Sequence, residues 1–198
     1  MAGKGFQGLM IWTRALLAAL LLVGASSRLA AGEGEEVDVA LVIAVDISFS
    51  MDLEEQKLQK EGYIDALNSP DVLRAIRMGM TGKIAITYFE WANSGDQRIV
   101  VPWTIIDGPE SARAVTDRIA ATPIRRAQRT SISGALRFGQ KLFEALPYQP
   151  LRRVIDVSGD GPNNAGEAVE AARDALRAER IVINGMPILL KRDYRGWG

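Results

Sequence analysis

The feature that most constrains the fold is a set of apolar runs that alternate with helix-forming segments. The first run, Val37–Val45, is apolar except for Asp38 and ends at Asp46. Apolarity without strict alternation is typical of a strand covered on both faces, as in parallel sheets flanked by helices. Comparable runs lie at 83–91, 153–158 and 181–185. We therefore expect an α/β domain with a doubly wound, mostly parallel sheet.

The segments between these runs predict helices and one hairpin. Asn93–Asp96 reads as a turn, after which Arg98–Trp103 returns as an antiparallel edge strand. Asp52 and Glu55 form a possible capping pair at the start of the first helix. The expected helices cover residues 52–67, 110–120, 132–146 and 165–176.

The first residues of the chain differ from the rest. Lys4 and Arg14 precede an apolar run of about eleven residues, 15–25, which is shorter than the roughly 20 that a membrane helix needs. Small residues follow, so we interpret residues 1–32 as a signal peptide and expect an exported protein without a stable membrane anchor. A short membrane anchor or a buried helix is the alternative. Residues 33–37 are expected to be an acidic lead-in, and 38–198 the domain.

Composition narrows the classes of function. Lys and Arg together number 24, as do Asp and Glu, so the chain has no net positive charge that would attract nucleic acid. The chain contains neither cysteine nor histidine, which excludes thiol nucleophiles, zinc fingers, iron–sulfur clusters, disulfides and a lipidated cysteine. A metal in this chain would have to be a hard cation with oxygen ligands.

Oxygen-bearing side chains lie on three loops that should meet at the carboxyl ends of the strands, where such sheets bind ligands. Asp46, Ser48 and Ser50 occupy alternate positions directly after the first strand. Thr130 precedes the helix over 132–146, and Asp160 follows the strand over 153–158 between two glycines. One carboxylate with two hydroxyls suits Mg²⁺ or Mn²⁺, which prefer octahedral oxygen coordination and retain water.

These residues resemble the metal-ion-dependent adhesion site of von Willebrand factor A domains. The matching positions are Asp46-x-Ser48-x-Ser50, Thr130 ahead of Gly134-Ala135-Leu136, and Asp160-Gly161. One bacterial exported branch, the domain of unknown function 1194 group, is similar over four further stretches. These are Glu61-Gly62-Tyr63, Phe89-Glu90-Trp91-Ala92, Val157-Ser158-Gly159-Asp160-Gly161 and Ile183-Asn184-Gly185.

The resemblance implies a role for each ligand position. Asp46 would hold the metal largely through water, Ser48 and Ser50 would ligate directly, and Thr130 and Asp160 would complete the shell. The metal would keep an exchangeable water that a carboxylate of a protein partner can replace. The resemblance therefore implies an exported, periplasmic, metal-dependent adhesion-type binding domain rather than an enzyme.

Three other interpretations stay open. Serine and aspartate also cap helices, and Asp160 suits an ordinary turn, so each loop taken alone is ambiguous. A metal-dependent phosphatase or phosphotransferase could use Asp46 as its nucleophile, although Ser48 stands where a second carboxylate would be needed. Family members continue with a further strand and helix, so we expect a C-terminally truncated domain. A non-functional relic is the third alternative.

Overall fold

The computed structural model describes residues 34–188, which form a five-stranded sheet in the order β3-β2-β1-β4-β5. Strand β1 pairs in parallel with β2 and β4, β4 pairs in parallel with β5, and β3 is antiparallel to β2. The predicted mostly parallel sheet with one antiparallel edge strand is confirmed. The strands are β1 (Glu36–Asp46), β2 (Ile84–Trp91), β3 (Gln97–Ile106), β4 (Gln149–Gly159) and β5 (Ile181–Pro187).

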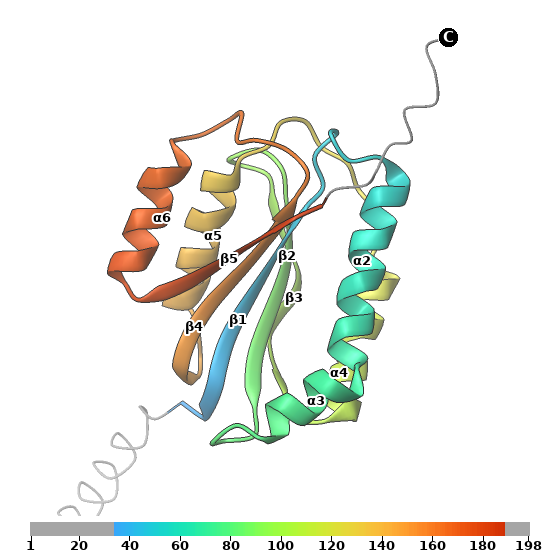
Figure 1. The fold of residues 1–198 in the computed structure, drawn as a ribbon, viewed down its shortest axis with the longest axis vertical. Helices are drawn as coiled ribbons and strands as arrows, with labels where there is room; N and C mark the ends of the chain where they lie inside the picture. The colour runs from blue at the N-terminus through green and yellow to red at the C-terminus, as the bar shows by residue number, and fades with distance from the viewer. Residues whose placement is uncertain (1–33, 189–198) are drawn as a thin grey trace, which may run out of the picture. The chain divides into compact units, whose positions relative to one another are not determined.

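Two layers of helices cover the sheet, as Figure 1 shows. On one face α5 and α6 pack against a core cluster that includes Val42, Phe89 and Ile155. On the other face α2, α3 and α4 pack against a cluster that includes Ile43, Ile86 and Val101. The helices are α2 (Leu53–Asn68), α3 (Pro70–Arg77), α4 (Pro109–Ala121), α5 (Ile132–Glu144) and α6 (Val169–Ala178).

Strand β1 begins at Glu36, inside the segment 33–37 that was expected to be an acidic lead-in. Glu36 and Val37 were assigned to that lead-in, but both belong to β1 and pair with Gln149 and Pro150 of β4. The physical reason is burial, since the side chain of Val37 is fully covered. The lead-in is therefore reduced to the residues before Glu36.

The capping pair at the start of α2 is confirmed. Asp52 accepts a hydrogen bond from the Glu55 backbone N–H at 2.9 Å, and Glu55 accepts one from the Asp52 N–H at 2.7 Å. This capping box satisfies two backbone donors that the first turn of a helix leaves free. It also ends the preceding loop sharply, two residues after Ser50.

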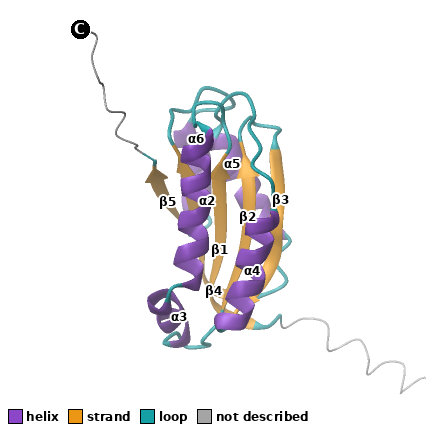
Figure 2. Ribbon diagram, turned by 90° about the vertical axis from the view of Figure 1, so that its right-hand side faces the viewer, coloured by secondary structure: helices purple, strands orange, loops and turns teal. Residues whose placement is uncertain are grey.

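The carboxyl ends of the parallel strands gather at one end of the domain, where the loops from β1, β4 and the β2–β3 turn lie together (Figure 2). The loop between α4 and α5 joins them, because Ser48 and Ala127 form a β-bridge. Within residues 34–188 no helix combines the length and the apolarity that crossing a membrane requires. The predicted signal peptide, 1–32, and the predicted shortening of the C-terminus lie outside the described residues.

Candidate metal centre

Asp46 is the last residue of β1, the central strand, and its side chain is completely buried. One carboxylate oxygen, Oδ1, accepts a hydrogen bond from the Ser48 backbone N–H at 2.7 Å. The other, Oδ2, has no hydrogen-bond partner among the described residues. A buried carboxylate oxygen without a donor is costly, so the carboxylate needs a positive group or a donor that the described residues do not supply.

The electrostatics of Asp46 follow from this burial. Burial raises the pKa of Asp46 from 3.8 to about 6, while hydrogen bonds from Ser48 oppose the shift and the charge of Asp160 adds to it. The carboxyl is therefore ionised at neutral pH, but less favourably than an exposed aspartate. A cation at Oδ2 would offset that cost.

Ser48, Ser50 and Asp160 form a chain of hydrogen bonds beside Asp46. The hydroxyls of Ser48 and Ser50 are 2.8 Å apart, and Ser50 Oγ donates to Asp160 Oδ1 at 2.6 Å. The Ser50 hydroxyl therefore connects Ser48 to Asp160. Residues that are 110 positions apart thus present their oxygens at one point.

Two glycines flank Asp160, and one of them, Gly159, is required for this close approach. A Cβ at Gly159 would lie 2.7 Å from Asp46 Oδ2, which is closer than real contacts permit. A Cβ at Gly161 would lie 3.5 Å from Ser50 Oγ, which is an ordinary contact. Gly159 is therefore the position at which any side chain would displace the Asp46 carboxylate.

Thr130 is held to the same cluster indirectly. Its backbone N–H donates to Asn164 Oδ1 at 2.8 Å, and its carbonyl accepts from the Asn164 N–H at 2.8 Å. Its hydroxyl is not hydrogen-bonded to the Ser48–Ser50–Asp160 chain within residues 34–188. Of the five predicted ligands, the structure links Asp46, Ser48, Ser50 and Asp160 directly, and Thr130 through the loop that carries Asp160.

Comparison with known proteins places the chain in a family. Residues 36–197 match the family described as "Protein of unknown function (DUF1194)". The chain belongs to this family. No curated protein sequence matches the DUF1194 chain.

Solved structures that resemble the DUF1194 chain have the von Willebrand factor A-like fold. A mussel byssus protein, proximal thread matrix protein 1 with a zinc-occupied MIDAS motif, has 14% identity and a TM-score of 0.61. A von Willebrand factor type A structure from Catenulispora acidiphila has 14% identity and a TM-score of 0.54. An aerotolerance-related membrane protein from Bacteroides fragilis has 22% identity and a TM-score of 0.55.

These likenesses show the fold alone. The match covers 78% of the DUF1194 chain for the mussel protein, 75% for the Catenulispora structure and 79% for the Bacteroides protein. The chain spans 39% of the mussel protein, 33% of the Catenulispora chain and 74% of the Bacteroides chain.

The sequence analysis assigned no role to three residues that hold the site of this DUF1194 domain in place, Gln59, Asn163 and Asn164. Gln59 of α2 donates to the Asp46 carbonyl at 3.0 Å and accepts from Ser158 Oγ at 2.7 Å. Asn163 accepts from the Ser133 backbone N–H at 3.2 Å, next to Asn164. The two asparagines directly after Gly161-Pro162 were a usable signal, because Asn side chains commonly bond loop backbone. No comparable sequence pattern marked Gln59.

Arginines anchor the loop that leads to Thr130. Arg126 donates to the carbonyls of Phe49 and Met51 at 2.9 and 2.7 Å, which ties this loop to the first one. Arg125 lies 3.5 Å from Glu90 and 3.3 Å from Asp96. The pKa of Glu90 is raised by its burial, and the charge of Arg125 limits the rise. Both arginines therefore contact protein groups that hold the loop in place.

The ligand chemistry of the centre combines carboxylate and hydroxyl oxygens. Within residues 34–188 no three His, Cys, Asp or Glu side chains form a group suited to a metal ion. The cluster offers two carboxylates, Asp46 and Asp160, and the hydroxyls of two serines. Such a set leaves a bound divalent cation with coordination positions that the side chains do not fill.

Proposed function

We propose that this domain binds Mg²⁺ or Mn²⁺ through Asp46, Ser48, Ser50, Thr130 and Asp160, and that the bound cation serves to bind a protein partner. The observation that carries the proposal is the unpartnered Oδ2 of Asp46 beside the Ser48–Ser50–Asp160 chain. The donor set fits a hard divalent cation, because every ligand is an oxygen and two of them are carboxylates. A bound cation would supply a positive charge and an exchangeable position to a carboxylate of the partner.

The chain's own residues prepare the site before any partner arrives. Ser48 fixes the Asp46 carboxylate through its backbone N–H, and Gly159 leaves room for Oδ2. Ser50 holds Asp160 against the first loop. These contacts hold the ligands in place, which lowers the ordering cost of binding. We also propose that the protein is exported, in keeping with the N-terminal pattern of residues 1–32.

The phosphatase alternative finds little support in the geometry. A nucleophilic aspartate must reach a phosphorus atom, whereas the Asp46 side chain is completely buried. Position 48 is a serine whose hydroxyl bonds Ser50, so it supplies no carboxylate for proton transfer. Binding is the function that this arrangement supports best.

Proton relaxation of water in the presence of Mn²⁺ tests the proposal, because it reports both binding and an exchangeable water. We expect the protein to enhance Mn²⁺-induced relaxation, and acetate at millimolar concentration to reduce the enhancement by replacing the water. Ser50→Ala should weaken Mn²⁺ binding about ten- to a hundredfold, since it breaks the chain that positions Ser48 and Asp160.

Ser69→Ala is the matched control. It removes a hydroxyl that caps α3 and takes no part in the centre, so Mn²⁺ binding should stay as in the wild type. A protein that binds Mn²⁺ without enhancing relaxation would contradict the exchangeable position. Equal Mn²⁺ affinity in Ser50→Ala and the wild type would contradict the ligand set.

A further inference from the structure

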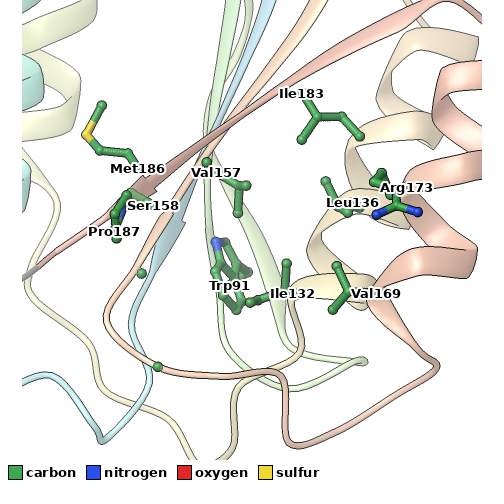
Figure 3. A pocket seen from close by; sticks show the side chains of 13 residues that line it. Trp91, Ile132, Leu136, Val157, Ser158, Val169, Arg173, Ile183, Met186 and Pro187 are labelled. Atoms are coloured by element: carbon green, nitrogen blue, oxygen red, sulfur yellow. The ribbon is translucent and has the colours of Figure 1, made fainter.

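A cavity of about 340 Å³ lies between the carboxyl ends of β4 and β5 and the helices α5 and α6. It shares a wall with the metal loop, because Gly159 and Gly161, on either side of Asp160, both line it. Its volume is at the lower end of the range for pockets that hold small molecules. Figure 3 shows the open space at its centre and the apolar side chains around it, which include Trp91, Ile132, Leu136, Val157, Val169 and Ile183.

One residue that lines this cavity, Trp91, carries a polar atom without a partner. Trp91 is completely buried, and its indole Nε1 has no hydrogen-bond acceptor among the described residues. Buried indole N–H groups usually have an acceptor, so this one calls for an oxygen that the described residues do not provide. Trp103 shows the ordinary case, since its Nε1 donates to the Leu142 carbonyl at 3.0 Å.

The rim of the cavity carries a positive charge. Arg173 of α6 lines the cavity and pairs with its sequence neighbour Asp174, whose side chain is 61% exposed. An exposed pair of this kind contributes little, so the guanidinium is free to exchange Asp174 for another anion. The cavity thus combines apolar lining side chains, one lining tryptophan with a buried, unpartnered N–H and one lining arginine.

We propose that this cavity is a second binding site, and that its ligand is a small aromatic carboxylic acid with an oxygen acceptor at the end of the ring opposite the acid. The ring would lie against Ile132 and Ile183, the acid would pair with Arg173, and the distal oxygen would accept from Trp91 once a small shift of the indole ring exposes its N–H. The site does not depend on the metal, because its lining side chains do not include Asp46, Ser48 or Ser50.

Titration with 4-hydroxyphenylacetate tests this proposal, with the indole N–H signals of ¹⁵N-labelled protein as the readout. We expect saturable binding at millimolar concentration or below and a downfield shift of the Trp91 indole proton, assigned with Trp91→Phe. Phenylacetate, which lacks the distal hydroxyl, and 4-methylphenol, which lacks the acid, should each bind about three- to tenfold more weakly.

Variants separate the parts of the site. Trp91→Phe should remove the advantage of 4-hydroxyphenylacetate over phenylacetate, and Arg173→Gln should remove its advantage over 4-methylphenol. Ile183→Phe should fill part of the cavity and weaken all three probes at least about tenfold. Ile183 is half-buried on the edge strand, so this variant remains folded even where Trp91→Phe does not.

Ser50→Ala distinguishes this site from the metal centre, since Ser50 is exposed and does not line the cavity, so the affinity for 4-hydroxyphenylacetate should stay within about twofold of the wild type. Three results would overturn the proposal. The first is that the folded wild type does not bind 4-hydroxyphenylacetate. The second is that it binds but the Trp91 indole signal does not shift, and the third is that Ile183→Phe binds with unchanged affinity. A Trp91 shift that depends on protein concentration without any probe would mean that a second copy fills the cavity instead.

Discussion

At Gly159 the lack of a side chain is required by the neighbouring carboxylate. A Cβ there would lie 2.7 Å from Asp46 Oδ2. We expect Gly159→Ala to weaken Mg²⁺ binding at least about tenfold and to lower the free energy of unfolding by about 1–3 kcal/mol, because Asp46 or the β4 end must move. Calorimetry and chemical denaturation measure the two effects.

Gly185→Ala on β5 is the matched glycine control. A Cβ at Gly185 meets nothing within 4 Å, so both quantities should stay near wild type. Wild-type Mg²⁺ affinity in Gly159→Ala would show that the position of the Asp46 carboxylate does not matter for the metal.

Asp46 makes the stability of the metal-free protein depend on pH. Its pKa in the folded chain, about 6, lies above its ordinary 3.8, so folding favours the protonated form. The protonated form of Asp46 therefore adds to the stability of the fold. This stabilisation is complete below pH 4 and is lost as the pH rises through 6. We expect Asp46→Asn to raise the free energy of unfolding by about 3 kcal/mol at about pH 8, and to change it little below pH 4.

Urea denaturation in the presence of a chelator, across this pH range, measures the difference. Asp65→Asn, which removes an exposed carboxylate of α2, should show no such pH dependence. Added Mg²⁺ should stabilise the wild type and not Asp46→Asn, which narrows the difference between them. An Asp46→Asn protein that is less stable than the wild type at alkaline pH without metal would refute this account of Asp46.

At the scale of the element, α2 connects the metal loop to β4. Gln59 bridges the Asp46 carbonyl and the Ser158 hydroxyl, and it is almost completely buried. We expect Gln59→Leu to destabilise the fold by about 1–3 kcal/mol, because it leaves buried polar groups without partners. Metal affinity should fall as well, since the end of β1 loses its anchor.

Gln59→Glu separates the two contacts. Its carboxylate still accepts from Ser158 but cannot donate to the Asp46 carbonyl, so it should lower metal affinity while keeping the link to β4. Gln140→Leu on α5 is the control, because it removes an exposed hydrogen bond to Glu179 and should cost at most about 0.5 kcal/mol. Equal metal affinity in the wild type and both Gln59 variants would limit Gln59 to a structural role.

Element boundaries show where sequence reasoning stops. No helix was expected between the one over 52–67 and the strand over 83–91, so α3 was missed. Ser69 in fact caps a new helix, and Pro70 occupies its first turn, where the missing N–H costs nothing. Helix α6 was expected from 165 but starts at Val169, because Gly166 takes a φ of +83° and Asn163 and Asn164 bond the loops.

For the whole molecule, the sheet was predictable because its central strands are apolar on both faces. The position of Asp46 at the end of β1 followed from the same pattern. The hydrogen bond from Ser50 to Asp160 spans 110 residues, and no local pattern predicts it; the family resemblance supplied that pairing. The unpartnered Oδ2 of Asp46 and the Gln59 bridge required coordinates, because both depend on distances between elements.

Isothermal titration of the purified protein with Mg²⁺ and Mn²⁺, beside Asp46→Ala, measures whether this domain binds a metal through Asp46. We expect the wild type to bind at millimolar concentration or below and Asp46→Ala to lose this binding, while circular dichroism shows both proteins to be folded. No binding by a folded wild type, or equal binding by Asp46→Ala, would contradict the metal-dependent function and favour a domain that keeps the fold without the metal.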